Sequence, residues 1–311
     1  MNPVIMPPPA IDQATRLREL VLDRKDASAG RSKITGVRSV SILSGKGGVG
    51  KSNLAVNMAL AIANQGMNVT LLDADLGLAN IDILFGVVPK FNLGHVLRGE
   101  KELSDILFRV GERLTIVPGG SGLRELADID SERQAWMIDR LSFLENDTDV
   151  LIFDTSAGLH RNVLAFAMAS DLSVLVTTPE PTAIRDSYSV LKSLWQSTGG
   201  NANIGLVVNM AQDKDEAESV SYRILSAAEQ FLGCRARYLG CILWDAAIRD
   251  SVKKRRPLLL SNERAVSVQC FKDLAGKVFE PRPEAVEAPL EVGGTSFLRR
   301  LINQMTRKKA D

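Results

Sequence analysis

Short apolar runs rich in β-branched residues alternate with amphipathic segments along most of this chain, and this alternation restricts the fold more than any other feature. The runs predict strands at 39–43, 68–72, 113–117, 149–153, 172–177, 204–209 and 237–243. The segments between and after them predict helices at 52–64, 131–145, 181–196, 214–232 and 262–279. Runs such as VLIF (150–153) are apolar on both faces, which is typical of central parallel strands. The pattern therefore predicts an α/β protein with a doubly wound, mostly parallel sheet and helices on both faces.

The two ends of the chain differ in composition from this alternating body. Residues 27–37 are rich in Ser, Gly and Lys, and residues 280–294 are rich in Pro, Glu and Gly, as linkers are. Helical periodicity recurs outside both linkers, at 10–26 and at 296–306. We therefore expect an N-terminal extension at 1–37, a single large domain at 38–279, and a linker with a short helix at 280–311.

The segment SILSGKGGVGKSN contains the pattern G-x-x-x-x-G-K-S between a predicted strand and a predicted helix. In that context the glycines let backbone N–H groups point inward and hold phosphate oxygens. Lys51 would neutralise the β and γ oxygens, and the Ser52 hydroxyl would bind Mg²⁺. The alternative is a glycine-rich turn that binds no nucleotide. We predict an ATP and Mg²⁺ site on a loop formed by Gly45, Lys46, Gly47, Gly48, Val49, Gly50, Lys51 and Ser52.

Acidic residues stand where two of the predicted strands end. Asp154 directly follows the run VLIF, and a carboxylate there can reach the Mg²⁺ shell, directly or through water. Asp73 and Asp75, in LLDADLG, end another predicted strand and can approach the γ-phosphate. Alternatively, an acidic residue just past a strand caps the next helix or stabilises a turn. The sequence leaves both interpretations open for Asp73 and Asp154.

A second lysine in the loop, Lys46, gives the sequence its resemblance to the MinD/ParA ATPases, whose phosphate loop has the deviant Walker A form. DADLGLANID (73–82) resembles the family's switch I, and DTSAG (154–158) resembles its Walker B and switch II segment. The resemblance implies ATP hydrolysis to ADP, and an ATP-bound homodimer that is otherwise monomeric. It also implies that Lys46 reaches the partner's phosphates and that Asp75 activates the attacking water.

The same resemblance implies further contacts to nucleotide and metal. Ser52, Asp75 and Asp154 would hold Mg²⁺, partly through water, and Gly158 would lie at the nucleotide. Asn53 stands where many members of the family have threonine. Asn209 matches the family's adenine-contacting asparagine, whose amide can pair with the base edge, although such a residue can also cap the following helix.

Within this family the sequence looks most like the flagellar number and placement regulators, the FlhG (FleN, YlxH) branch. SGKGGVGKSN and DLGLANIDILFG carry the likeness, and DQATRLR (12–18) matches a D-Q-A-x-x-L-R motif that many of those proteins carry ahead of the ATPase domain. In that branch the motif's helix binds an FlhF-type GTPase and stimulates GTP hydrolysis. This implies a partner-binding role for Asp12, Gln13, Ala14, Leu17 and Arg18. The alternative is an amphipathic helix packed on its own domain.

The branch also implies other partners and a rival function. A flagellar C-ring protein or a flagellar transcription activator is a possible partner within this branch. The alternative function is that of a MinD- or ParA-like ATPase that positions the division site, DNA or other cargo. For nonspecific DNA binding the sequence offers only KKRR (253–256), which otherwise forms the solvated end of a helix.

The C-terminal segment TSFLRRLINQMTRKK has an apolar stripe with basic flanks. Such a helix can lie in a membrane interface and be attracted to anionic lipid, and this resembles the membrane-targeting tail of MinD and FlhG. Two copies in an ATP dimer would bind with avidity. The alternative is a terminal helix docked on its own domain. The stripe consists of Phe297, Leu298, Leu301, Ile302 and Met305.

Composition excludes several other classes of protein. The net charge is +1 with 45% hydrophobic residues, which is typical of an ordinary globular protein and makes specific nucleic-acid binding improbable. The three cysteines have no C-x-x-C spacing and lie far from both histidines, which argues against a zinc site or disulfides. The sequence MNPVIMPPPA lacks the features of a signal peptide. We therefore expect a cytoplasmic protein that visits the inner face of the cell membrane, with the cell pole as one candidate position.

Overall fold

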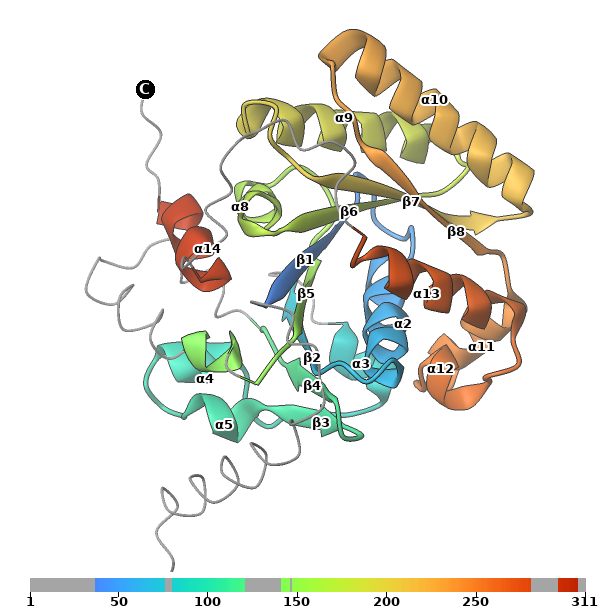
Figure 1. The fold of residues 1–311 in the computed structure, drawn as a ribbon. Coiled ribbons are helices and arrows are strands. Elements are labelled where there is room, and N and C mark those ends of the chain that lie inside the picture. The colour runs from blue at the N-terminus through green and yellow to red at the C-terminus, as the bar shows by residue number, and fades with distance from the viewer. Residues whose placement is uncertain (1–36, 76–79, 121–140, 146, 281–295, 307–311) are drawn as a thin grey trace, which may run out of the picture. The chain divides into compact units, whose positions relative to one another are not determined.

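The computed structural model describes residues 37–75, 80–120, 141–145, 147–280 and 296–306. All of them belong to one unit of the chain, Val37–Asp311. Its centre is an eight-stranded sheet with the strand order β3-β4-β2-β5-β1-β6-β7-β8 (Figure 1). Every neighbouring pair is parallel except β3 and β4. The predicted doubly wound, mostly parallel fold is confirmed.

The predicted strands are all present in the sheet. They are β1 (Arg38–Leu43), β2 (Val69–Ala74), β4 (Leu114–Val117), β5 (Val150–Thr155), β6 (Leu172–Thr177), β7 (Ile204–Ala211) and β8 (Arg237–Leu243). The sequence pattern does not predict β3 (Phe108–Val110), which is antiparallel to β4 at the edge of the sheet. Three residues carry too short an alternation to distinguish a strand from a connection.

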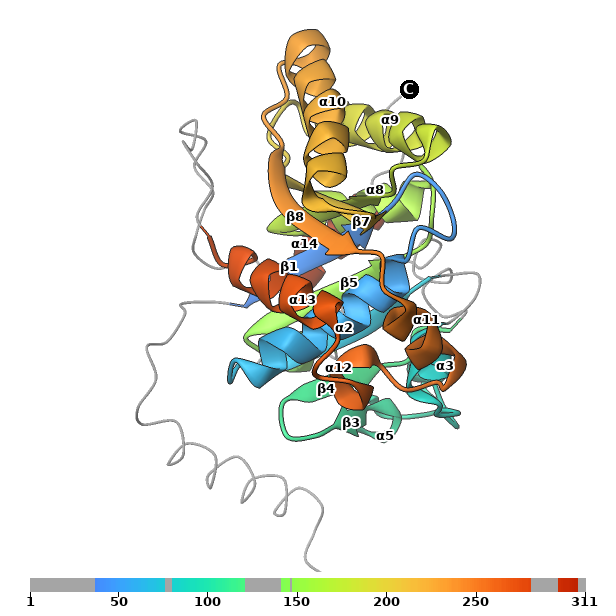
Figure 2. The same ribbon diagram turned by 90° about the vertical axis from the view of Figure 1, so that its right-hand side faces the viewer.

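Helices cover both faces of the sheet because alternate residues of its central strands point in opposite directions. On one face, Val40 and Ile42 pack in a core with α2 (Lys51–Asn64) and α13 (Val266–Lys277), which lie side by side in Figure 2. On the other face, Leu43 packs with α8 (Arg161–Ala169), α9 (Pro181–Ser197) and α10 (Lys214–Leu232). The connections contain the short helices α3 (Ile81–Phe85), α4 (Leu93–Leu97), α5 (Leu103–Ile106), α11 (Ala246–Lys253) and α12 (Leu258–Ser261).

The helices that the sequence pattern misses lack a clear amphipathic period. In α8 most positions are apolar and more than half are buried, so no polar face marks the helix. The other missed helices, α3, α4, α5, α11 and α12, have eight residues or fewer, which is too short for a reliable pattern. The predicted helix at 131–145 lies mostly outside the described residues.

The C-terminal helix α14 (Phe297–Thr306) packs against α8. All members of its apolar stripe are at most 3% exposed. The ring of Phe297 stacks on that of Phe153 in β5, with centroids 4.3 Å apart, and Arg161 donates a hydrogen bond to the carbonyl of Met305 at 2.9 Å. In this conformation the helix is docked on its own domain, so contact between the stripe and a membrane requires release of α14. In the described ranges, no helix has the length and apolar character needed to cross a membrane.

Candidate nucleotide-binding site

The glycine-rich loop, residues 44–50, lies at the carboxyl end of a central strand. β1 ends at Leu43 between β5 and β6, and α2 begins at Lys51. In open α/β sheets, ligands bind in the crevice beyond the carboxyl ends of the strands. The first N–H groups of α2 face the loop and favour a bound anion.

Glycine is required at both ends of this loop. A Cβ added to Gly45 would lie 2.4 Å from the backbone carbonyl carbon of Asp186 in α9. At Gly50 the φ angle is +88°, and an added Cβ would lie 2.2 Å from Nδ2 of Asn209. The loop is therefore held tightly between α9 and the end of β7, in a conformation that only glycine adopts without strain.

Asp154 and Lys51 meet beneath the loop. Asp154 is completely buried at the end of β5, and the ammonium group of Lys51 lies 3.9 Å from Asp154 Oδ1. Burial raises the pKa of Asp154 to about 7, although the charge of Lys51 acts in the opposite direction. In the described part of the protein, neither carboxylate oxygen of Asp154 accepts a hydrogen bond of normal geometry. A buried carboxylate of this kind is chemically suited to a cation or to a water bound to one.

Ser52 is positioned to share such a cation with Asp154. It is the second residue of α2, it is half-buried, and its hydroxyl lies close enough to Asp154 to lower the pKa of that carboxyl. Among the described residues, no group of three or more acidic, His or Cys side chains is arranged so that it could hold a metal ion by itself. Mg²⁺ commonly uses one or two protein ligands together with phosphate oxygens and water, so Ser52 and Asp154 fit a magnesium nucleotide.

Asp73 and Asp75 have different surroundings. The carboxylate of Asp73 accepts hydrogen bonds from the backbone N–H groups of Asp75, Asn80 and Ile81, at 2.9 to 3.1 Å. Burial raises its pKa to about 6 despite these bonds. Of the two alternatives for Asp73, the structure therefore favours the turn and cap, because its oxygens are used by the backbone that leads into α3. Asp75 is only partly buried, and its charge raises the pKa of Asp154, so the two residues lie within electrostatic range.

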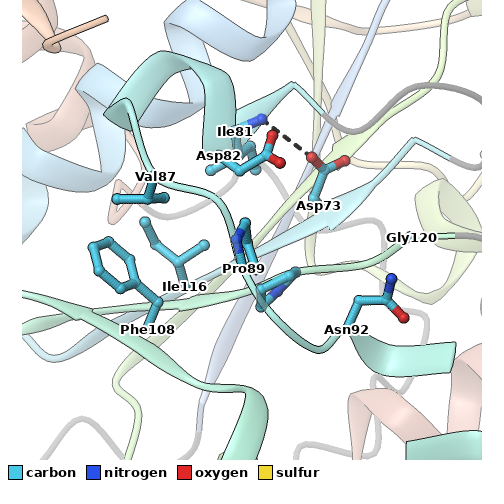
Figure 3. Close-up of a pocket in the computed structure, with 10 residues that line it drawn as sticks. Asp73, Ile81, Asp82, Val87, Pro89, Asn92, Phe108, Ile116 and Gly120 are labelled. Atoms are coloured by element: carbon cyan, nitrogen blue, oxygen red, sulfur yellow. Dashed lines mark hydrogen bonds between the residues drawn. The ribbon is translucent and has the colours of Figure 1, made fainter. Parts of the chain in front are cut away.

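A small cavity of about 80 Å³ lies beside Asp73, on the side toward β3 and β4 (Figure 3). Val87, Phe108 and Ile116 form its apolar wall, and Asp73 lies opposite, bonded to the N–H of Ile81. Pockets that bind nucleotide-sized ligands have several times this volume. The cavity is therefore too small for ATP.

Lys46 projects from the loop to the start of α9. Its ammonium group lies 2.7 Å from Glu180 Oε2 and 3.1 Å from Thr182 Oγ1. Its side chain is 39% exposed, and the neighbouring Gly47 and Gly48 are also exposed. Lys46 is therefore held at the surface beside the loop, whereas Lys51 is buried beneath it.

Hydrogen bonds tie the loop to the end of β7 and to the segment that follows β5, and another joins two residues within α2. Asn209 is buried at the end of β7, and its Nδ2 donates to the carbonyl of Val49 at 2.7 Å. The N–H of Gly158 donates to the carbonyl of Ser44 at 2.8 Å. The side chain of Asn53 accepts a hydrogen bond from Asn57 one turn along α2. The structure thus assigns Asn209 a bond to the phosphate loop, and its adenine contact stays a prediction.

The sequence pattern misses three residues beside the loop: Glu180, which precedes α9, and Thr182 and Asp186 within it. The signal was present, because TTPEPTAIRDS follows a buried strand and begins a helix with proline. The motif at 12–18, with Asp12, Gln13, Ala14, Leu17 and Arg18, lies outside the described residues.

Comparison with known proteins identifies relatives of the whole domain. Residues 40–258 match the family model described as the CobQ/CobB/MinD/ParA nucleotide binding domain. The chain is 36% identical over 267 residues to the antiactivator FleN of Pseudomonas aeruginosa, covering 86% of this chain and 94% of the relative. It is 33% identical to the flagellum site-determining protein YlxH of Helicobacter pylori, covering 94% of this chain and 99% of the relative.

Solved structures of similar fold include cell-division ATPases. The Pyrococcus furiosus cell division ATPase MinD superposes with a TM-score of 0.62 at 25% identity, covering 78% of this chain and 98% of that one. The septum site-determining protein MinD of Pyrococcus horikoshii, solved with Mg-ADP, has the same TM-score and identity, with 78% and 96% coverage.

Proposed function

Because the chain belongs to the CobQ/CobB/MinD/ParA family of nucleotide-binding proteins, we propose that it is an ATP-hydrolysing switch that regulates the number and placement of flagella. The relatives named antiactivator FleN and flagellum site-determining protein YlxH support the flagellar role. The observation that carries the ATPase is the buried Asp154, whose carboxylate faces Lys51 beneath the loop. The MinD relative solved with Mg-ADP supports a magnesium nucleotide as the ligand.

The phosphate chemistry follows from the side chains around the loop. Backbone N–H groups of residues 45–50 and the ammonium group of Lys51 bind the β and γ oxygens of ATP. Ser52 and Asp154 would hold Mg²⁺, with Asp75 contributing through water, and the bound ion would neutralise charge that develops on the phosphate oxygens. Asp75 orients the attacking water for in-line displacement.

Dimerisation completes the site in this proposal. The surface position of Lys46 supports a role outside its own phosphate site, because its ammonium group already lies at α9. In the ATP-bound dimer, the ion pair of Lys46 with Glu180 breaks, and Lys46 contacts the phosphates of the nucleotide bound to the partner. There its charge stabilises the transition state. Hydrolysis removes that attraction, and the dimer returns to monomers.

Membrane attachment depends on release of α14. The stripe of α14 is buried against Phe153, which precedes Asp154, and Arg161 holds the far end of the helix just after the 154–158 segment. In our proposal, residues 154–158 rearrange when ATP binds, and this weakens the contacts of α14 with Phe153 and with Arg161. Two released helices in one dimer then bind an anionic membrane surface with avidity. The protein would be cytoplasmic as a monomer and attached to the inner face of the cell membrane, including the pole, as a dimer.

The N-terminal motif supplies a second activity in this proposal. Gln13 and its neighbours in the motif bind an FlhF-type GTPase and stimulate GTP hydrolysis. A flagellar C-ring protein or transcription activator is the further partner class, and the name antiactivator of the P. aeruginosa relative supports the second of these. GTP hydrolysis by the GTPase with the wild-type chain and with Gln13→Ala tests this part independently of the ATPase.

The ATPase proposal is tested by three proteins in excess ATP and Mg²⁺. Wild-type protein should hydrolyse ATP and dimerise transiently in size-exclusion chromatography with light scattering. Asp75→Ala should bind ATP and remain dimeric, because the water is no longer oriented. Lys51→Ala should remain monomeric because it loses productive ATP binding. A monomeric Asp75→Ala protein that binds ATP would refute the dimer mechanism.

A further inference from the structure

A second cleft lies between the edge strand β3 and the connection from α11 to α12. It is bounded by residues 85–86, 108–110 and 254–257 and by Leu260, and we call it the β3 groove. It is shallow and largely open to solvent, with a volume of about 570 Å³. None of its lining residues belongs to the nucleotide site described above.

The base of the β3 groove is apolar. Phe85 and Phe108 are half-buried and pack against the main core. Leu260 on α12 is 39% exposed at the other side of the cleft. An apolar surface that is both concave and open to water gains free energy when a partner covers it.

The rim of the groove is basic and unneutralised. Arg109, Lys254, Arg255 and Arg256 are exposed, and within the described ranges none of them forms an ion pair. The whole chain has a net charge of only +1, so these four cations are a local concentration of charge. An acidic ligand is therefore attracted to this rim more than to the surface as a whole.

The basic turn is held in place by the end of α3. Arg255 has a left-handed φ of 53°, and its carbonyl oxygen would lie 3.0 Å from a Cβ added to Gly86. Gly86 itself has a φ of +67°, so the two backbones approach closely at a residue without a side chain. The backbone that carries the cations therefore lies directly against the end of α3.

An extended peptide also finds backbone partners at this cleft. β3 pairs with β4 on one side only, and in the described sheet its other side is an open edge. Extended segments bind such edges by adding a strand, with alternate side chains entering pockets. We infer that the β3 groove binds an acidic, extended segment of a partner protein, whose apolar side chains enter the groove and whose carboxylates meet the basic rim. This inference does not depend on the flagellar role.

Nucleic acid suits the same surface less well. Four cations allow few phosphate contacts, and binding through few contacts is weak at physiological salt. The two phenyl rings are half-buried at the base of the cleft, so they do not offer the free faces on which bases stack. Duplex DNA therefore serves as the competing probe in the test.

The test uses the full chain and two fluorescein-labelled peptides, EELFEELFEE and EESSEESSEE, at about 150 mM salt. We expect the first to bind saturably in anisotropy titrations, with a Kd on the order of 10 µM. The second should bind at least about tenfold more weakly, because it lacks the apolar anchors. Lys254→Glu/Arg256→Glu should weaken the first peptide at least about tenfold, because both charges at the rim are reversed.

The matched control reverses two exposed cations elsewhere, Lys192→Glu in α9 and Arg223→Glu in α10, and should bind the first peptide like wild type. Thermal melting establishes that both variants are folded. The inference is overturned if the first peptide does not bind, if both peptides bind equally, or if the control loses as much affinity as the groove variant. Duplex DNA that binds in place of the peptide, and is lost in the groove variant, would overturn it in favour of nucleic acid.

Discussion

Asp154 makes the stability of the nucleotide-free protein depend on pH. Its pKa is raised to about 7 by burial, against 3.8 for an ordinary aspartate. Between these values the folded protein keeps a proton that the unfolded chain has released, so the free energy of unfolding falls as pH rises from about 4 to about 7. Asp154→Asn removes this titration. The variant should therefore be more stable than wild type at about pH 8, by on the order of a few kcal/mol.

Calorimetric melting across this pH range checks the prediction. Asp73, whose pKa is raised to about 6, titrates in both proteins, and the comparison at about pH 8 lies above that value. If the melting temperatures of wild type and Asp154→Asn decline in parallel as pH rises, the prediction is contradicted. In the presence of ADP and Mg²⁺, wild type should instead be more stable than Asp154→Asn, because an amide is a poorer ligand for a cation than a carboxylate.

Gly45→Ala tests the packing of the loop against α9. An added Cβ would meet backbone atoms of Asp186, which cannot move away as a flexible side chain would. We expect the nucleotide-free protein to lose about 1–3 kcal/mol of stability, the usual cost of overpacking. Gly47→Ala is the control, because a Cβ there meets nothing within 4 Å. Equal denaturant midpoints for the two variants would show that the contact with Asp186 yields easily.

For single residues, the sequence predicts which side chains belong to the site better than it predicts which residues they contact. The pattern G-x-x-x-x-G-K-S, between a predicted strand and a predicted helix, led us to expect Lys51 and Ser52 where the loop meets the helix, and both lie at the start of α2. It left two roles open for Asp73, because capping depends on where the backbone N–H groups of residues 80 and 81 point. The ion pair of Lys46 with Glu180 joins residues 134 positions apart, which no local pattern can reveal.

At the scale of elements, α14 is held by a few polar bonds at its edges as well as by its apolar stripe. Arg300 donates to the carbonyl of Ala169 at 2.9 Å and to Asp171 Oδ1 at 3.0 Å. Arg300→Ala should make the amides of α14 exchange hydrogen about tenfold faster while the melting of the sheet changes little, since one or two hydrogen bonds contribute about 1–2 kcal/mol. Hydrogen-exchange mass spectrometry measures both.

The neighbouring exposed cation provides the control for this prediction. Arg299→Ala should leave the exchange of α14 unchanged, because Arg299 lies on the solvent side of the helix. If the two variants exchange alike, the bonds of Arg300 do not hold α14 in place.

Element prediction succeeded where burial on two faces produced a strong pattern. The central strands are apolar on both faces because helices cover both, so their sequences differ clearly from those of loops. β3 and α8 were missed for opposite reasons: one is too short, and the other is too uniformly apolar. The sequence cannot predict whether the stripe of α14 faces protein or membrane, because both environments favour a helix with one apolar face.

At the scale of the whole molecule, the proposed dimer can be tested by mixing two inactive variants. Lys46→Ala keeps Lys51 and Asp75 but cannot serve a partner. Asp75→Ala keeps Lys46 but cannot orient water in its own site. If Lys46 acts across the dimer, a mixed dimer contains one complete site, formed by Asp75 of the first protomer and Lys46 of the second.

When the two proteins are combined at equal concentration before ATP is added, half of the dimers that form are mixed, and each of these has one active site out of two. We therefore expect ATP hydrolysis in the mixture to reach about a quarter of the wild-type rate, while either variant alone stays near background. Phosphate release, measured over a range of mixing ratios, should peak at equal amounts. If Lys46 acts on its own protomer's nucleotide, no combination of these chains contains a complete site and the mixture stays inactive. Mixing Asp75→Ala with Lys51→Ala is the control. It should stay inactive in either case, because Lys51→Ala does not bind ATP productively and Asp75→Ala cannot orient water.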